Sequence, residues 1–106
     1  MASNQVWARR LREARVAKGL SQRQLGIDAG LDPSVASTRI NRYEMGVHRA
    51  DYPITQKVAQ VLDIPVAYLY ADSDALAQII LIFERANDEQ KAYLLKMAHA
   101  LNRPTP

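Results

Sequence analysis

The stretch SQRQLGIDAGLDPSVASTRINRYE, residues 21–44, decides the fold. Ser21 is a good N-cap for a helix over residues 22–29, because its hydroxyl can accept a hydrogen bond from a free N–H of the first turn. Gly30 ends this helix, since glycine tolerates the positive φ that often follows a helix. The first half of the stretch therefore predicts one short, capped helix.

The second half of the stretch predicts another helix, over residues 33–45. Asp32 can cap it, and Pro33 suits the first helical position, where the N–H that proline lacks would have no partner. The apolar face of this helix holds Ala36, Ile40 and Tyr43, and the opposite face holds Ser37, Thr38, Asn41 and Arg42. Two short helices joined by a turn are typical of a helix-turn-helix.

The flanking sequence is helical as well, since no stretch alternates between apolar and polar residues as a strand would. Apolar spacing and helix breakers predict further helices over residues 4–18, 54–62, 66–70, 74–87 and 88–102. Asp88 can cap the last of them, and Asp72 to Asp74 form the one plausible boundary in the sequence. We therefore expect an all-α chain with one domain over residues 1–71 and a two-helix extension over residues 72–106.

Composition limits the class of protein. The chain has 106 residues, enough for one domain with its own core, and no cysteine, so neither a disulfide nor a thiolate metal site is expected. Its longest apolar run, residues 79–83, is too short to cross a bilayer, and its first residues lack the layout of a signal peptide. These features predict a soluble, cytoplasmic protein that does not enter a membrane.

Positive charge is concentrated in the predicted first domain. Residues 1–71 carry ten Lys/Arg and six Asp/Glu, a net charge of +4, whereas residues 72–106 carry four and five, a net charge of −1. Nucleic-acid-binding proteins use basic surface to contact phosphates. An ordinary protein surface can carry the same charge, so charge alone leaves both interpretations open.

The side-chain pattern is more specific than geometry or charge. It consists of Leu20-Ser21-Gln22-x-x-Leu25-Gly26-x-x-x-Gly30-Leu31, followed by Ile40-Asn41-Arg42-Tyr43-Glu44-x-Gly46. This pattern resembles the phage Cro/repressor-type helix-turn-helix family, often called XRE-like, and the resemblance extends from Leu11 to Leu69. It implies a five-helix lambda-repressor-like DNA-binding domain, here followed by a C-terminal helical hairpin. The implied function is a sequence-specific double-stranded DNA-binding transcriptional regulator. Nothing in the sequence clearly recruits polymerase, so repression by occlusion of the operator is the expected mechanism.

The resemblance also implies roles for individual residues. Base-reading positions in the major groove fall on Ser37, Thr38, Asn41 and Arg42. Phosphate contacts are expected from Gln22, Arg23, Ser34, Arg39 and Arg49. Arg15 and Glu44 match a structural salt bridge of the family, although a free Arg15 could bind a phosphate instead. Arg9, Arg10 and Arg12 either flank the groove or form a solvated helix face.

In one place the sequence departs from the family. Between Gly30 and Glu44 it has about four residues more than usual, which is close to one helical turn. Either the recognition helix starts one turn early, at Asp32 and Pro33, or the connection between the two helices is longer. Either outcome changes the contacts expected at the N-terminal end of the recognition helix, where Ser34 could bind a phosphate or a base edge and the acidic Asp32 should avoid phosphates.

Residues 72–106 are unusually apolar for two surface helices. One face holds Leu76, Ile79, Ile80 and Phe83, and another holds Leu94, Leu95, Ala98 and Leu101. These faces either pack on the first domain or form the twofold interface of a homodimer. A homodimer would hold two recognition helices about one DNA turn apart and would read a pseudo-palindromic operator.

Catalysis is not expected from this sequence. It has no cysteine nucleophile, no phosphate-binding glycine loop and no cluster of metal ligands, and His48 and His99 lie far apart in sequence. We therefore expect neither a metal nor another cofactor. The alternative to a regulator is an antitoxin or adaptor-type protein-interaction module, which would use the same fold and bind a protein partner through the C-terminal hairpin.

Overall fold

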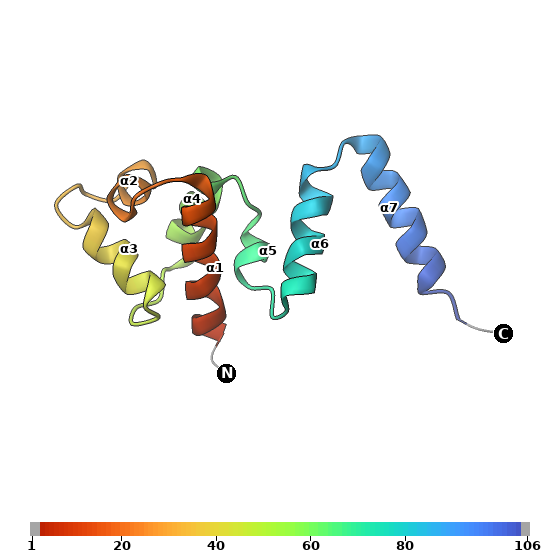
Figure 1. The fold of residues 1–106 in the computed structure, drawn as a ribbon, viewed down its shortest axis with the longest axis horizontal. Helices are drawn as coiled ribbons and strands as arrows, with labels where there is room; N and C mark the ends of the chain where they lie inside the picture. The colour runs from red at the N-terminus through yellow and green to blue at the C-terminus, as the bar shows by residue number, and fades with distance from the viewer. Residues whose placement is uncertain (1–2, 105–106) are drawn as a thin grey trace.

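A computed structural model describes residues 3–104, and every regular element in that range is a helix (Figure 1). The helices are α1 (Ser3–Lys18), α2 (Gln22–Asp28), α3 (Ala36–Glu44), α4 (Tyr52–Leu62), α5 (Val66–Leu69), α6 (Asp74–Arg85) and α7 (Asp88–Leu101). The all-α prediction is confirmed, with five helices followed by two more at the C-terminal end. None of these helices is long and apolar enough to span a membrane.

Helices α1 to α5 enclose one hydrophobic core. Its fully buried side chains come from each of these helices and include Leu11, Leu25, Ile40, Val58 and Leu69. The rings of Trp7 and Tyr43 meet edge to face, with their centroids 6.0 Å apart, and so join α1 to α3. Because α1 packs against α3, α4 and α5, it is the central support of the domain (Figure 1).

Helices α2 and α3 approach each other unusually closely. Ser21 caps α2 as predicted, with its hydroxyl accepting a hydrogen bond of 2.9 Å from the N–H of Gln24. A Cβ at Gly26 would lie 2.7 Å from Cβ of Ala36, so only glycine allows this approach. The sequence pattern therefore correctly identified both the start of α2 and its contact with α3.

Helix α3 begins at Ala36, so the prediction of a helix from residue 33 is wrong. Asp32 is not its cap. Its side chain instead accepts hydrogen bonds from the N–H of Ser34 (2.8 Å) and from the Ser34 hydroxyl (2.6 Å), which lower the pKa of Asp32. The N–H of Val35 donates to the carbonyl of Asp32 and closes a turn. The additional residues therefore lie in the connection between α2 and α3, the second of the two predicted outcomes.

Helix α6 packs onto the five-helix domain beside α5. Ala77 is buried there, and Ile80 and Leu81 pack against the core. The guanidinium of Arg10, 2% exposed, donates to the carbonyl of Ala71 (2.9 and 3.2 Å) and to the side chain of Asp74 (2.9 Å). Neither of the predicted positions for Arg10, beside a groove or on a solvated face, is correct. Its real partners are far from it in sequence.

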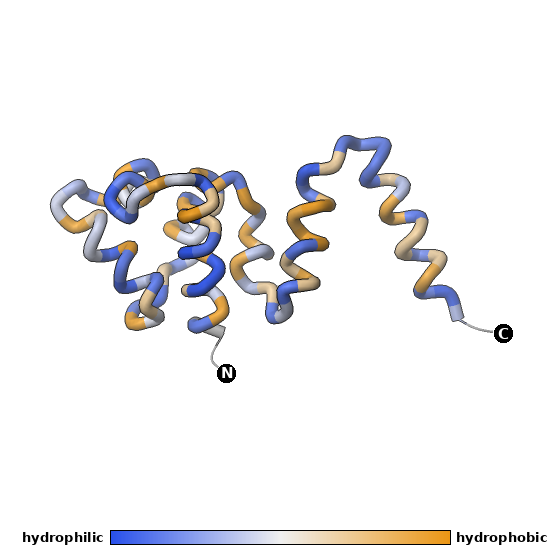
Figure 2. The backbone as a smooth tube through the Cα atoms, in the orientation of Figure 1, coloured by the Kyte–Doolittle hydropathy of each residue, from blue (hydrophilic) through white to orange (hydrophobic). Residues whose placement is uncertain are grey.

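Helix α7 projects away from the rest of the molecule, and none of its residues is buried (Figure 1). The prediction that Asp88 caps this helix is wrong. The N-cap is Asn87, which forms a reciprocal capping box with Gln90. The radius of gyration is 16.2 Å, whereas a compact chain of this length has about 13 Å. Figure 2 shows apolar residues along both α6 and α7. The prediction that the extension packs on the first domain therefore applies to α6 and not to α7.

Candidate nucleic-acid interface

The exposed face of α3 is a direct consequence of how this helix packs. Ala36, Ile40 and Tyr43 are buried, as their spacing predicted, and they fix the rotation of α3 about its axis. The opposite face consequently points to solvent and holds Ser37, Thr38, Asn41 and Arg42, all of which are exposed. Figure 1 places this helix at the end of the molecule farthest from α7. The structure thus brings all four predicted base-reading residues onto one accessible surface.

An ion pair fixes the C-terminal end of α3 to α1. The Arg15 guanidinium donates through Nη2 to Oε1 of Glu44 (3.0 Å) and through Nε to Oε2, while its Nη1 donates to the carbonyl of Leu20 (2.9 Å). The side chains of Arg15 and Glu44 are only 13% and 3% exposed. Hydrogen bonding to Glu44 raises the pKa of Arg15. Arg15 is therefore paired, and the alternative of a free Arg15 does not match this arrangement.

Gln22 connects the start of α2 to the exposed face of α3. Its Nε2 donates to Oδ1 of Asn41 and to Oε1 of Glu44, both at 3.1 Å. The glutamine expected to contact a phosphate thus holds the amide of Asn41 in a defined orientation. Sequence reasoning missed this bridge, because 19 residues separate its two ends and no local pattern marks it.

The remaining predicted phosphate ligands surround this face and differ in their constraints. Arg23 on α2 and Arg49 after α3 are exposed. Arg39 is also exposed, but its guanidinium stacks over the Tyr43 ring at 5.8 Å and donates to the Tyr43 hydroxyl at 2.6 Å. Ser34 already donates its hydroxyl proton to Asp32, an acidic neighbour that a phosphate would avoid.

The chemistry of this surface is that of recognition. Arginine and asparagine can each bind a base edge through two hydrogen bonds, and an α-helix fits the major groove of DNA. Within residues 3–104, no group of three or more His, Cys, Asp or Glu side chains could hold a metal ion. The arrangement is therefore suited to binding a duplex through hydrogen bonds and charge.

Comparison with known proteins gives consistent matches. A family model described as helix-turn-helix matches residues 11–69, which is more than half of the chain. Uncharacterized HTH-type transcriptional regulators of Sinorhizobium medicae (strain WSM419) and Rhizobium meliloti (strain 1021) are each 31% identical over 64 residues. That alignment covers 60% of this chain and 43% of each relative, so the chain spans less than half the length of these relatives.

A solved structure is similar over most of the chain. The transcriptional regulator BswR superimposes with a TM-score of 0.83 at 38% sequence identity. The match covers 88% of this chain and 92% of that chain, so it extends beyond the residues that the family model matches.

Proposed function

This chain belongs to the helix-turn-helix family, and on that premise we propose that it is a sequence-specific double-stranded DNA-binding transcriptional regulator. The exposed face of α3 carries the proposal, because its buried stripe aims Ser37, Thr38, Asn41 and Arg42 at solvent together. Arg42 would bind O6 and N7 of a guanine, and Asn41 would bind N6 and N7 of an adenine. Ser37 and Thr38 would contact neighbouring base edges.

Residues around α3 would hold the duplex in register. Arg23, Arg39 and Arg49 supply exposed positive charge for phosphates, and Ser34 is a weaker candidate because of its bond to Asp32. Gln22, already bonded to Asn41, would orient that base reader. Both protons of its amide are donated within the chain, to Asn41 and to Glu44, so its side chain would have to release one of these bonds to donate to a phosphate. The buried pair of Arg15 and Glu44 would keep α3 at a fixed angle to α1.

We further infer that the protein acts as a homodimer that represses by occluding a pseudo-palindromic operator. Exposed apolar side chains on α6 and α7 support the dimer, and occlusion requires no surface beyond the DNA-binding face. DNA binding of this kind would take place in the cytoplasm, with no cofactor. Transcription from a promoter that overlaps the operator should fall when the protein is added, and a rise would indicate an activator.

Binding to DNA from upstream of the protein's own gene tests the central proposal, with fluorescence anisotropy as the measurement. Arg42→Ala should weaken binding by about 5- to 150-fold and relax the preference at one base pair, because a bidentate guanine contact contributes about 1–3 kcal/mol. Arg42→Lys keeps the charge but loses the bidentate geometry, and it should lose most of the same preference.

Arg23→Ala is the matched control for a phosphate contact. It should weaken binding to all sequences equally. It should also reduce the slope of the logarithm of the binding constant against the logarithm of the salt concentration by about one, because one phosphate contact is lost. The base-reading assignment is wrong if Arg42→Ala leaves both affinity and sequence preference unchanged. Failure to bind any duplex between 50 and 200 mM salt (roughly the range over which phosphate-driven binding is lost) would instead favour the antitoxin or adaptor module, whose protein partner would use the exposed residues of α7.

A further inference from the structure

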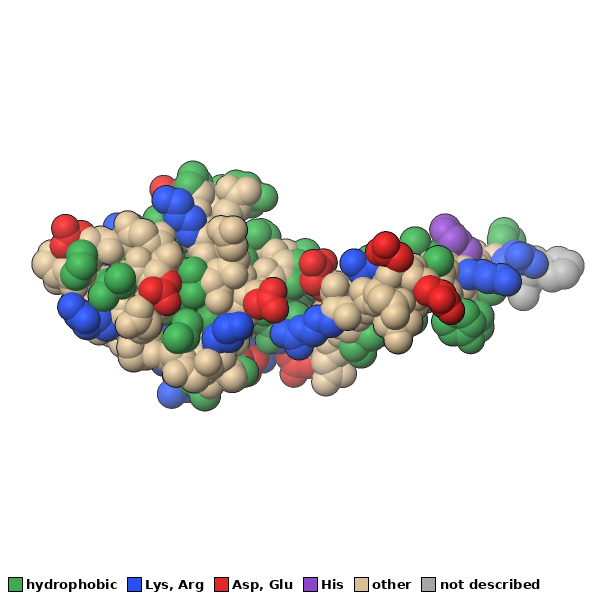
Figure 3. Space-filling model, turned by 90° about the horizontal axis from the view of Figure 1, so that it is seen from above, with side chains coloured by type: hydrophobic (Ala, Val, Ile, Leu, Met, Phe, Trp, Pro, Cys, Tyr) green, Lys and Arg blue, Asp and Glu red, His purple; other side chains and the backbone are tan. Residues whose placement is uncertain are grey.

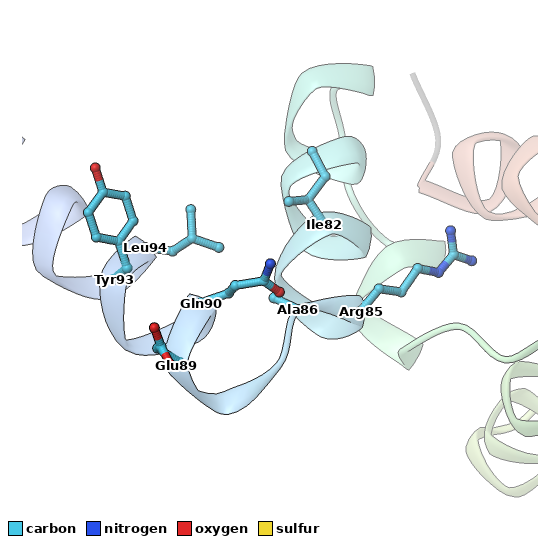
Figure 4. A pocket seen from close by; sticks show the side chains of 7 residues that line it. All are labelled: Ile82, Arg85, Ala86, Glu89, Gln90, Tyr93 and Leu94. Carbon is cyan, nitrogen blue, oxygen red and sulfur yellow. The ribbon is translucent and has the colours of Figure 1, made fainter.

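Helices α6 and α7 form an open V whose inner surface is apolar. Only Ala86 and Asn87 separate the two helices, which diverge from this vertex (Figure 1). Between them lies a groove of about 580 Å³, lined by Ile82 of α6 and by Tyr93 and Leu94 of α7, with Arg85, Glu89 and Gln90 near the closed end (Figure 4). The space-filling view of Figure 3 also shows exposed hydrophobic side chains on the C-terminal part of the molecule that α6 and α7 form.

Helix α6 has two apolar faces and uses only one of them. Ala77, Ile80 and Leu81 pack against the five-helix domain. Leu76, Ile79 and Ile82 are 49%, 61% and 56% exposed. Successive residues of a helix are rotated by about 100° about its axis, so these three side chains and Phe83 form a second stripe that covers about 120° of the circumference. A stripe of this width fits one partner helix.

Helix α7 has a much wider apolar surface. Tyr93, Leu94, Leu95, Met97 and Leu101 are between 36% and 87% exposed. At about 100° per residue, these side chains and the neighbouring alanines span about 220° of the helix circumference. One helix partner covers a stripe only slightly wider than about 100°, so α7 is suited to contact on two sides.

The connection between the helices holds the V open. The side chain of Gln90 accepts from the N–H of Asn87 (2.9 Å), and the side chain of Asn87 accepts from the N–H of Gln90 (2.8 Å). Ala86 is extended, and the ammonium of Lys91 lies 5.6 Å from the centroid of the Phe83 ring. Closing α7 onto its own α6 would require this two-residue connection to change conformation.

We propose that the groove is occupied by α7 of a second copy of the chain, and that the two copies exchange this helix reciprocally. The layers would then follow the order α6, partner α7, α7, partner α6. Each α7 lies between two helices, as its wide apolar surface requires, and each α6 gains one partner for its outer stripe. This inference rests on the homodimer of the proposed function and specifies which segment each copy donates.

Charge supports the same occupant. In this exchange the two vertices lie at opposite ends, so the twofold axis is perpendicular to the two α7 helices and makes them antiparallel. The acidic N-terminal end of one copy, with Asp88 and Glu89, then faces the C-terminal end of the other, which carries Lys96, His99 and Arg103. Opposite charges therefore meet at both ends of the pair.

The surface available is sufficient for a specific dimer. A helix of 14 residues is about 21 Å long and about 10 Å wide, which gives about 650 Å² of lateral surface. Contact on two sides would bury most of this surface, and the outer stripe of α6 adds to it. The sum approaches the about 800 Å² per partner of a standard interface.

Disulfide cross-linking distinguishes the exchange from a closed hairpin, because the chain has no cysteine of its own. Exchange makes α6 parallel to the α7 that it receives, so Ile82 should lie near Met97 of the second copy. If the hairpin of one chain closed instead, α6 and α7 would be antiparallel, and Ile82 and Met97 would be offset by about 9 Å along the helix axes. A disulfide requires two Cα atoms within about 7 Å, so this pair could not be cross-linked within one chain. Leu76, by contrast, would face Met97 of its own chain if the hairpin closed.

The full chain carrying Ile82→Cys and Met97→Cys should therefore form covalent dimers on mild oxidation. Leu76→Cys with Met97→Cys should remain uncross-linked within the chain, and Met97→Cys alone measures contact across the twofold axis. A disulfide within the monomer of the Leu76 variant would overturn the exchange, even if sedimentation showed a dimer.

Sedimentation across dilution tests the interface itself. Leu101 is 87% exposed in one copy, so Leu101→Glu should fold normally. It should raise the dimer dissociation constant at least about 30-fold, because it places a charge in an apolar contact beside the acidic N-terminal end of the second α7. Val16→Glu, at a site 59% exposed on α1, is the matched control and should leave the constant unchanged. A chain that is monomeric at every concentration and still selects one DNA sequence would overturn the exchange and leave DNA recognition intact. A cross-linked dimer that binds no DNA would overturn the proposed function and leave the exchange intact.

Discussion

Replacing Gly26 by alanine tests the contact that sets the spacing of α2 and α3. A Cβ at this position would lie 2.7 Å from Cβ, 2.9 Å from the carbonyl oxygen and 3.0 Å from Cα of Ala36. Nonbonded carbons normally approach to about 3.5–4.0 Å. None of the three atoms belongs to a flexible side chain, so the two helices themselves must separate by several tenths of an ångström or more.

Two opposing effects determine the size of the change. Overpacking in a core lowers the free energy of unfolding by about 1–3 kcal/mol, and the rigidity of the Ala36 backbone favours the upper end of that range. Alanine also favours the helical conformation of α2 over glycine by about 1 kcal/mol. The net result should be a destabilisation of about 2 kcal/mol. For a chain of 106 residues, this corresponds to a decrease of about 9 °C in melting temperature.

Urea unfolding and thermal melting followed by circular dichroism measure both quantities. Ala36→Gly in the same chain is the companion variant, because it removes the nearest atom, and the double-mutant cycle should show a favourable coupling of about 1 kcal/mol. A Gly26→Ala chain as stable as the parent would refute the reasoning, since helix propensity would then outweigh a contact that the structure makes too short.

Three other changes test buried or charged groups. Arg15→Met leaves the buried Glu44 carboxylate without its cation and should lower the free energy of unfolding by about 3 kcal/mol in urea, with recovery when Glu44→Met is added; no recovery would contradict the pairing. Hydrogen bonds from Arg10 hold the pKa of Asp74 below its ordinary value, so the stability that Asp74 contributes is present above about pH 3.9 and is lost as the pH falls through the lowered folded-state pKa. The melting temperature of Asp74→Asn should therefore lie below that of the parent at neutral pH and converge with it in acid; a gap independent of pH would exclude this cause. Thr55→Val removes a buried hydroxyl that has no hydrogen-bond partner in the described part of the chain, and it should raise the free energy of unfolding by about 1 kcal/mol, whereas a loss would indicate a partner for the hydroxyl.

Local signals in the sequence were sufficient where one structure satisfies them. The positions of Ala36, Ile40 and Tyr43 allow only one buried face for α3, and that face determines which residues are exposed. Ser21 and Gly26 have single roles, as cap and as close contact, that side-chain chemistry alone predicts. The helix-turn-helix and its exposed face could therefore be predicted from the sequence.

The start of α3 could not be predicted, because Asp32 satisfies two local structures equally well. Aspartate before proline can cap a helix, but it can also accept hydrogen bonds from a residue two positions later, as it does from Ser34. The burial of Ala36 against Gly26 decides between them, and this is a tertiary contact. At α7, by contrast, a local signal was available: the spacing of Asn87 and Gln90 is that of a capping box.

The buried arginine was beyond reach of sequence reasoning for a different reason. Arg10 lies in a run of basic residues that local sequence cannot distinguish, and its acceptor on Ala71 is 61 residues away. The same contact has a consequence for DNA recognition. Arg10 anchors the start of α6 to α1, while Arg15 anchors the end of α3 to the same helix.

Helix α1 therefore joins α3, with the proposed DNA-binding face, to α6 through two arginines five positions apart. If α6 and α7 form the dimer, the distance between the two α3 helices depends on both anchors and not on α6 and α7 alone. A homodimer with rigid anchors would accept only one spacing of operator half-sites, because half-sites are read one helical turn of DNA apart. Loosening either arginine should therefore broaden the accepted spacing before it weakens binding to any single half-site.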